Sequence, residues 1–299
     1  MRILIATEKP FAPAAVNGIR QIVESSGHEL ILLEKYTERQ QLKEALTTVE
    51  AVIIRSDIIN EEVLETATNL KIVVRAGAGY DNVDLAACSK RKIVVMNTPG
   101  QNANAVAELA IGMMIYGYRN HFCPGTGTEL FGKTLGLCAC GNVGNRVKKI
   151  AEGFDMKIKI YDPYLNIEDK LQTMEELFTQ CQIVSLHIPL TNETRKCINY
   201  DLVMKMPKNA LLCNTARKEV IDEEGLIQAM RERKDLIYVT DIAAASPVFA
   251  EEFKNRYFAT PKKMGAETAE ANVNAGLAAA NQICGFFKDG CTTFQVNKF

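Results

Sequence analysis

The chain of 299 residues has no excess charge of either sign and no long apolar run. Its 35 Lys and Arg residues stand against 36 Asp and Glu residues, for a net charge of −1. This balance argues against nucleic acid or a membrane surface as a partner. Apolar runs stay well short of the ~18 residues that a membrane-spanning helix needs. The N-terminus, MRILIATEKP, lacks the charged and apolar regions of a signal peptide, so we expect none.

Paired cysteine spacing is also missing. The nine cysteines are an odd number and are scattered along the chain. Cys138, Cys181 and Cys213 lie in or beside apolar runs, as reduced core cysteines do. We therefore expect a cytoplasmic protein, and we expect no metal site.

What the chain does have is an alternation of short apolar runs with helix-length amphipathic stretches. We expect strands at 2–6, 28–34, 51–55, 71–76, 93–97, 133–140, 157–162, 182–188, 210–216 and 236–242. We expect helices at 13–26, 38–47, 60–68, 82–91, 104–118, 143–153 and 266–285, the fifth apolar nearly all round. Strands separated by helices indicate an α/β fold with parallel sheets, and the length favours about two domains.

A glycine-containing loop joins the strand at 133–140 to a helix. Residues 139–144 read ACGNVG, a G-x-G-x-x-G pattern with Ala139 in the first glycine position. Gly141 allows close approach of a pyrophosphate and Gly144 allows the helix to pack on the strand. Alanine can replace the first glycine in this turn if its φ stays negative. The alternative is a strand–helix corner that binds no nucleotide.

The next strand ends in Asp162, 18 residues after Gly144. A carboxylate at about this spacing binds the ribose hydroxyls of a dinucleotide, and it repels a 2′-phosphate. The loop and Asp162 together predict an NAD site, with NAD favoured over NADP. A surface aspartate at a strand end is the alternative.

A series of motifs carries a resemblance to a known family. The matching segments are IIRSDIINEEVL (53–64), VVRAGAGYDNVDLAA (73–87), VMNTPGQNANAVAELAIGMM (95–114), GKTLGLCACGNVG (132–144), YDPY (161–164), SLHIPLTNETR (185–195), MPKNALLCNTARKEVIDEEGL (206–226), TDIAAASP (240–247) and MGAETAEA (264–271). In this order they resemble the D-isomer-specific 2-hydroxyacid dehydrogenases, most closely the phosphoglycerate branch. The resemblance implies a short form without the regulatory domain.

The resemblance also implies an architecture and an activity. Two similar doubly wound parallel-sheet domains are expected: a flavodoxin-like substrate domain at 1–96 and 267–299, and a Rossmann NAD-binding domain at 97–266. The implied enzyme is a homodimer through its nucleotide domains. It uses NAD to interconvert 3-phospho-D-glycerate and 3-phosphohydroxypyruvate, the first step of phosphorylated serine biosynthesis. The open alternatives are a glyoxylate or hydroxypyruvate reductase and a non-catalytic NAD-sensing protein.

Individual site residues follow from the same motifs. The resemblance assigns substrate binding to Arg55, Ser56, Arg75, Gly77 and Asn102. It assigns cofactor binding to Ala78, Gly141, Asn142, Val143, Gly144, Asp162, Ile188, Thr215, Ala216, Asp241, Gly265 and Ala266. It assigns a catalytic role to Arg217, whose guanidinium can bind the carboxylate and polarise the C2 oxygen together. The alternative for Arg55 and Arg75 is that they form solvated salt bridges at their strand ends and do not bind substrate.

Two positions depart from the family pattern. The family's proton-transferring histidine is replaced by Lys263, and its partner glutamate is replaced by Ser246. A carboxylate supports a protonated histidine, but beside lysine it would move the pKa further from neutrality. The two replacements are therefore consistent with Lys263 as a substitute acid and base. A surface lysine, the neighbouring Lys262 and His187 are the alternatives, although we expect His187 to orient the site.

Overall fold

The structure is a computed structural model that describes residues 1–299, and the chain divides into two compact units. The first unit comprises residues 1–102 and 267–299, and the second comprises residues 103–266. The sequence-based division assigned 97–102 to the nucleotide domain, whereas these residues belong to the first unit. Hydrogen bonds explain the difference: the amide of Thr98 donates to the Gly77 carbonyl at 2.9 Å, and Gln282 Nε2 donates to the Asn97 carbonyl at 3.0 Å.

The first unit is built on a five-stranded parallel sheet in the order β2-β1-β3-β4-β5. Its strands are β1 Arg2–Thr7, β2 Glu29–Glu34, β3 Ala51–Ile54, β4 Ile72–Arg75 and β5 Val94–Asn97. Its helices are α1 Pro13–Ser25, α2 Arg39–Leu46, α3 Glu61–Leu64, α4 Leu85–Lys90 and α11 Ala269–Asp289. This is the flavodoxin-like strand order, and it reverses between β1 and β3.

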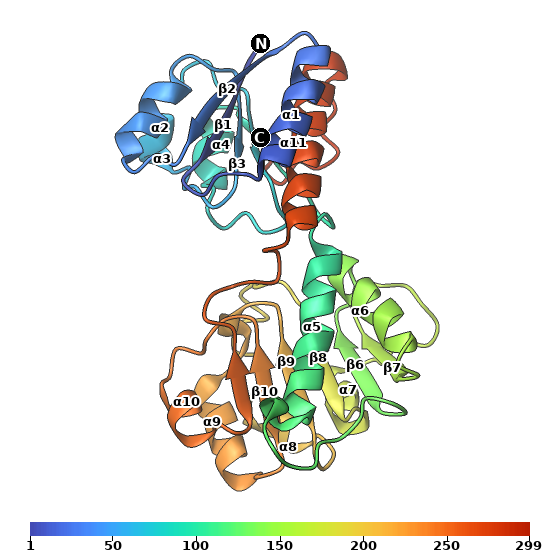
Figure 1. Cartoon of the computed structure of the whole chain (residues 1–299). Helices are drawn as coiled ribbons and strands as arrows, with labels where there is room; N and C mark the ends of the chain where they lie inside the picture. Colours follow the sequence, from blue (N-terminus) through green and yellow to red (C-terminus); the bar gives the residue numbers. More distant parts are fainter. The chain divides into compact units, whose positions relative to one another are not determined.

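Both faces of the first sheet are buried. Ile3, Ile5 and Ile53 point to the face covered by α1 and α11, which lie side by side in Figure 1. Leu4 and Val52 point to the opposite face, which α2, α3 and α4 cover. Because successive strand residues point to opposite faces, a sheet with helices on both sides requires the continuous apolar runs seen in the sequence.

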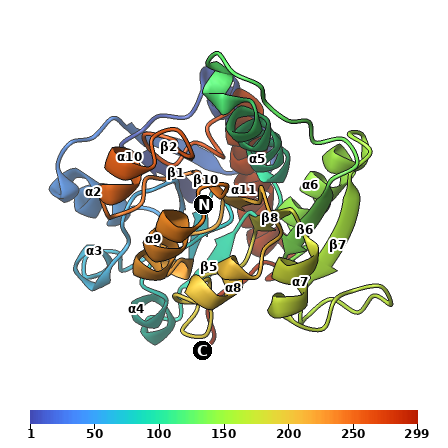
Figure 2. The same cartoon turned by 90° about the horizontal axis from the view of Figure 1, so that it is seen from below.

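The second unit contains a six-stranded parallel sheet in the order β11-β10-β9-β8-β6-β7. Its strands are β6 Thr134–Cys138, β7 Lys157–Tyr161, β8 Ile183–Leu186, β9 Leu211–Asn214, β10 Ile237–Thr240 and β11 Tyr257–Ala259. Its helices are α5 Ala103–Tyr118, α6 Asn142–Glu152, α7 Met174–Gln180, α8 Tyr200–Met204, α9 Glu223–Glu232 and α10 Val248–Glu252, with short 3-10 turns at Asn120–Phe122 and Lys218–Val220. In Figure 2, α5 and α6 lie on one side of the sheet, and α7, α8 and α9 lie on the other. The sheet is doubly wound and Rossmann-like, so the predicted fold class is confirmed.

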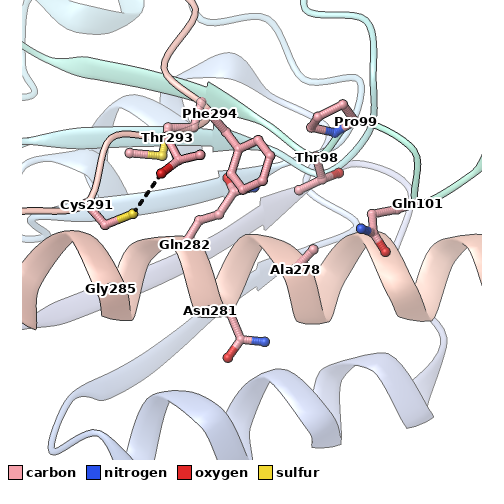
Figure 3. Close-up of a pocket in the computed structure, with 11 residues that line it drawn as sticks. Thr98, Pro99, Gln101, Ala278, Asn281, Gln282, Gly285, Cys291, Thr293 and Phe294 are labelled. Atoms are coloured by element: carbon pink, nitrogen blue, oxygen red, sulfur yellow. Dashed lines mark hydrogen bonds between the residues drawn. The ribbon is translucent and has the colours of Figure 1, made fainter. Parts of the chain in front are cut away.

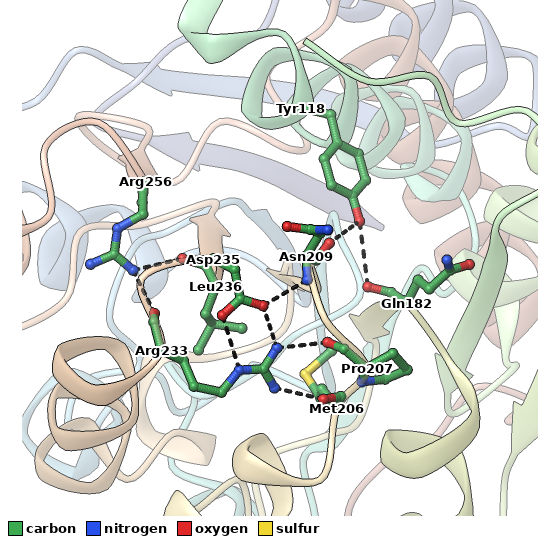
Figure 4. Close-up of polar contacts among 9 residues, drawn as sticks. All are labelled: Tyr118, Gln182, Met206, Pro207, Asn209, Arg233, Asp235, Leu236 and Arg256. Atoms are coloured by element: carbon green, nitrogen blue, oxygen red, sulfur yellow. Dashed lines mark hydrogen bonds and ion pairs between the residues drawn. The ribbon is translucent and has the colours of Figure 1, made fainter. Parts of the chain in front are cut away.

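Two arginine side chains bind backbone carbonyl oxygens at the end of the second sheet where its strands begin. Arg233 pairs with Asp235 and donates to the carbonyl oxygens of Met206 and Pro207 at 2.6 Å each (Figure 4). Arg256 donates to three further carbonyl oxygens, among them that of Arg233 at 2.9 Å. These bonds satisfy backbone groups at strand ends, so this edge is structural. No helix of the chain is long and apolar enough to cross a membrane.

Candidate active site

The two arginines predicted to bind the substrate lie side by side in the first unit. Arg55 directly follows β3 and Arg75 ends β4, and these strands are neighbours. Arg75 Nε donates to the Arg55 carbonyl at 3.0 Å. Ser56 follows them and is exposed, whereas Asn102 is half-buried directly before α5. The carboxyl ends of strands near the point where the order reverses are the usual ligand site of such sheets.

Gly77 is required by the position of the Arg75 side chain. Its φ is +150°, and a Cβ there would overlap the Arg75 guanidinium. The Gly77 carbonyl accepts from Thr98 and the Ala78 carbonyl accepts from Asn97 Nδ2. Since the C=O and N–H of a trans peptide point in opposite directions, the amides after these carbonyls point away from that contact. The turn can therefore offer backbone donors to an anion.

A buried carboxylate that the sequence did not single out organises the arginine loop. Asp57, 2% exposed, accepts hydrogen bonds from the amides of Glu8 and Arg55 and from the Tyr36 hydroxyl at 2.8 Å. Burial and this carboxylate raise the pKa of Tyr36. Asp57 thus holds together the segments that follow β1, β2 and β3. Its signal in the sequence was an acidic residue three positions after Ile54, the buried last residue of β3.

The nucleotide loop follows β6 in the second unit, where the strand order reverses between β6 and β8. Ala139 has a φ of +72°, so the expectation of a negative φ is wrong. The turn needs a left-handed residue at this position, and alanine adopts that conformation at an energetic cost. Gly144 is required because a Cβ there would lie 2.5 Å from the Ala139 oxygen, whereas the space around Gly141 is open.

Asp162 is buried at the end of β7 and faces the loop. One carboxylate oxygen accepts from the Cys140 amide at 2.9 Å, and the other accepts from the Tyr164 amide at 2.9 Å. Each oxygen retains a further lone pair for a ribose hydroxyl. Asn142 is exposed and Val143 is half-buried at the start of α6. The loop and the carboxylate therefore fit the adenosine side of a dinucleotide.

Histidine 187 follows β8 and contacts a predicted cofactor residue. Its Nδ1 lies 3.1 Å from the hydroxyl of Thr215, which follows β9. Its Nε2 is buried without a partner. Burial lowers the pKa of His187 to about 4, so the imidazole is neutral near pH 7. Ile188, next in the chain, is buried as well. The geometry suits an orienting residue better than a proton carrier.

Asp241, after β10, holds the loop that carries Lys263. Its carboxylate accepts from the Thr260 hydroxyl at 2.9 Å and from the amides of Met264 at 2.7 Å and Gly265 at 2.8 Å. A Cβ at Gly265 would lie 2.7 Å from the same carboxylate, so only glycine fits. Ala266 follows and is half-buried. Asp241 thus positions the predicted catalytic loop.

The two predicted catalytic side chains meet at one backbone atom. Lys263 Nζ donates to the Ala216 carbonyl oxygen at 3.3 Å, and Arg217 Nη1 donates to the same oxygen at 3.1 Å. Buried Asn214 fixes this turn, since its side chain bonds the Ala216 amide at 2.9 Å and the Arg217 carbonyl at 3.0 Å. The structure thus places an amine beside a guanidinium at the carboxyl end of β9.

Ser246, the second departure from the family pattern, lies on a loop held by Glu223. The Glu223 carboxylate accepts from the amides of Ala245 at 2.8 Å and Ser246 at 2.9 Å. A carboxylate is therefore present beside this loop, although both of its oxygens bind backbone. No local sequence pattern indicates this contact, because the partners are 22 or more residues apart.

A separate cavity of about 290 Å³ lies in the first unit, between α11, the residues after β5 and the C-terminal segment. Figure 3 shows Thr98, Gln101, Gln282 and Phe294 around it. No charged side chain lines this cavity, so it does not suit an anionic substrate. No group of three or more His, Cys, Asp or Glu residues is placed to hold a metal ion.

Comparison with known proteins identifies the class that this fold and site define. Residues 116–261 match the family model of the D-isomer specific 2-hydroxyacid dehydrogenase NAD binding domain. The hydroxypyruvate reductase of Thermotoga maritima is 35% identical over 279 residues, covering 85% of this chain and 90% of the relative. The chain therefore belongs to the D-isomer specific 2-hydroxyacid dehydrogenase family and is an oxidoreductase that uses NAD.

Several phosphoglycerate dehydrogenases are similar to this chain. The crystal structure of NAD+-bound 3-phosphoglycerate dehydrogenase from Entamoeba histolytica is 59% identical, with a TM-score of 0.94, and covers 100% of this chain and 99% of that chain. The D-3-phosphoglycerate dehydrogenase of Methanocaldococcus jannaschii is 34% identical over 276 residues, 82% of this chain and 51% of that protein. The chain spans about half the length of that curated relative.

Proposed function

We propose that this enzyme interconverts 3-phospho-D-glycerate and 3-phosphohydroxypyruvate, the first step of phosphorylated serine biosynthesis. The observation that carries the proposal is the 59% identity, over nearly the whole of both chains, to a 3-phosphoglycerate dehydrogenase. The paired Arg55 and Arg75 support it, because two guanidinium groups at adjacent strand ends suit a phosphomonoester. The turn at Gly77 and Ala78 would offer amides to an anionic oxygen of the substrate.

The proposed chemistry divides between two groups of the second unit. NAD, when bound, supplies the acceptor for the hydride from C2. The neutral amine of Lys263 takes the proton of the C2 hydroxyl during oxidation, and the ammonium returns it during reduction. Arg217 binds the substrate carboxylate and stabilises charge on the C2 oxygen. Asp241 and Asn214 keep the two cationic side chains in place through the bonds described above.

The residues around the cofactor have distinct proposed roles. Asp162 binds the ribose hydroxyls, and Gly141, Asn142, Val143 and Gly144 receive the pyrophosphate at the start of α6. Ile188, Thr215, Ala216, Asp241, Gly265 and Ala266 surround the nicotinamide side, and Ala78 is a further cofactor contact. Ser56 and Asn102 are proposed to bind the substrate. The open space at Gly141 and the free lone pairs of Asp162 support the cofactor assignment.

One assay tests the reaction. NADH oxidation is followed with 3-phosphohydroxypyruvate and, in parallel, with unphosphorylated hydroxypyruvate. We expect a kcat/KM at least tenfold higher with the phosphorylated acid. A preference for hydroxypyruvate would favour the reductase alternative, which the Thermotoga relative supports. Turnover of neither substrate would contradict an enzymatic role and favour an NAD-sensing protein.

We further propose a homodimer formed through the second unit. Helix α5 is rich in alanine and methionine, and the segment after it exposes Phe122 (69%) and Phe131 (67%). Exposed aromatic side chains of this size favour a protein contact. Light scattering should give twice the chain mass, and a monomer across a wide concentration range would contradict the proposal.

We propose the cytoplasm as the location of the enzyme. All nine cysteines are free thiols, and five are buried, as is common in a reducing compartment. A fluorescent fusion of the full chain should give a diffuse cytoplasmic signal, and retention in a secretory compartment would contradict this.

A further inference from the structure

The guanidinium of Arg55 already has an anionic partner within the first unit. Arg55 Nη2 lies 3.7 Å from the carboxylate of Glu267, a residue 212 positions later in the chain. The Arg55 side chain is only 16% exposed, whereas that of Glu267 is 43% exposed. The pair thus joins a fixed cation to a carboxylate that remains in contact with solvent.

The other contacts of Arg55 hold it in place without neutralising it. Arg55 Nη1 donates to the carbonyl oxygens of Lys9 at 3.2 Å and Pro10 at 3.3 Å. The guanidinium carbon lies 5.4 Å from the centre of the Phe11 ring. Carbonyl oxygens and an aromatic face carry no net charge, so among these contacts Glu267 supplies the negative charge beside the Arg55 guanidinium. An arriving anion must compete with Glu267 alone.

The backbone of Glu267 is fixed while its carboxylate is free to move. The next residue, Thr268, caps α11: its hydroxyl accepts from the Ala271 amide at 3.1 Å, and its carbonyl accepts from Asn272 Nδ2 at 2.8 Å. The carboxylate itself makes one long contact, to Arg55. Rotation of the Glu267 side chain therefore releases Arg55 without disturbing the helix.

We propose that Glu267 is an internal competitor for the substrate anion at Arg55. The inference rests on the proposed function, in which Arg55 binds the substrate phosphate. In the absence of substrate, the carboxylate neutralises the guanidinium, and a bound phosphate group displaces it. Two anions on one guanidinium repel each other, so the exchange lowers the affinity for every anion, including inorganic phosphate. Glu267 thereby sets the substrate concentration at which the site fills.

The variant Glu267→Gln removes the charge and keeps the shape. Partly exposed ion pairs contribute little, and the corresponding change in affinity is about 2- to 5-fold. We therefore expect the KM for 3-phosphohydroxypyruvate and the inhibition constant of inorganic phosphate each to fall by about 2- to 5-fold, with kcat within about twofold of wild type. The difference should shrink as ionic strength rises, because salt screens the carboxylate.

The matched control is Glu270→Gln. Glu270 lies in the first turn of α11, is exposed and makes no ion pair. The variant Glu270→Gln removes the same charge three residues away from Glu267. Its KM for 3-phosphohydroxypyruvate and its inhibition constant for inorganic phosphate should therefore stay close to wild type. A second measurement avoids turnover: inorganic phosphate should raise the melting temperature of Glu267→Gln at lower concentrations than it does for wild type.

The outcomes separate the inference from the proposed function. A KM and an inhibition constant that stay unchanged or rise in Glu267→Gln would overturn the inference, because Glu267 would then orient Arg55 or do nothing. Equal changes in Glu270→Gln would also overturn it, since the effect would be one of net charge. If wild type fails to reduce 3-phosphohydroxypyruvate, the proposed function is wrong. The melting shift with inorganic phosphate then decides whether Glu267 competes for anions at Arg55.

Discussion

Lys263 and Arg217 donate hydrogen bonds to the same atom, the carbonyl oxygen of Ala216. An ammonium and a guanidinium that share one acceptor lie close together at the carboxyl end of β9. A neutral amine is the form that accepts the hydroxyl proton in the oxidation direction. The shared contact is the observation behind the proposal that Lys263 carries the proton.

Replacing Lys263 with alanine should lower kcat by about 10²–10⁴, the usual contribution of a general acid–base residue. Binding of NADH should change little, because the loss falls on proton transfer. Stopped-flow turnover and fluorescence titration of NADH measure the two quantities. Since oxidation needs the neutral amine, the wild-type rate of oxidation should rise toward alkaline pH while reduction remains fast near neutrality.

Lys262→Ala is the control for this substitution, because Lys262 is also exposed and directly precedes Lys263. It should keep turnover within a few fold of wild type. Near-normal turnover of Lys263→Ala would show that this lysine is not the proton carrier. A loss only in Lys262→Ala would transfer the role to its neighbour.

Asp162 is expected to determine the choice of cofactor. Its carboxylate would repel the 2′-phosphate of NADP, so Asp162→Asn should raise kcat/KM for NADP relative to NAD. Asp162→Ala should change the cofactor preference in the same direction. It also removes the carboxylate that accepts from two backbone amides, so it should lower the free energy of unfolding by about 1–3 kcal/mol. Steady-state kinetics with both cofactors and urea unfolding separate these effects. Equal use of NAD and NADP by wild type would refute the assignment.

His187 should make stability depend on pH in the acid range. Its pKa is lowered to about 4 in the fold and is about 6.5 in the unfolded chain. Between these values the unfolded state binds more protons, so the free energy of unfolding falls as pH drops from 6.5 to 4, by up to about 3 kcal/mol. The variant His187→Asn does not titrate and should show a shallower decline in urea unfolding across this range. Parallel curves for the two proteins would contradict the prediction.

Local spacing predicted the parts of the site that are contiguous in sequence. Gly144 and Asp162 follow from one strand–loop–helix–strand unit, whose geometry is set within about thirty residues. The contacts of Glu223 with Ser246 and of Arg55 with Glu267 join residues far apart in the chain. Such contacts depend on how distant segments pack together in the folded chain. The periodicity of apolar residues along the sequence does not encode that packing.

The boundaries of helices and strands show the same difference between what local sequence predicts and what it does not. The predicted helix at 60–68 is a single turn, α3, because Asn60 caps it and the chain turns again at Leu64–Ala67. The strand β11 has three residues, too few for a period to be seen, and forms because β10 offers a free edge. The short, continuous apolar runs, in contrast, form strands as expected, since a sheet covered on both faces needs them.

The left-handed backbone of Ala139 gives the last prediction. Its φ of +72° costs an L-residue about 1–2 kcal/mol, and a glycine in its place loses about 0.5–1 kcal/mol more in chain entropy on folding. Ala139→Gly should therefore stabilise the protein by about 0.5–1 kcal/mol in urea unfolding. The control Ala14→Gly, at an exposed position in the first turn of α1, should destabilise it slightly, because glycine is a poorer helix former than alanine. If Ala139→Gly is neutral or destabilising, the positive φ is not a source of strain. In that case the Cβ of Ala139 makes a packing contact that offsets it.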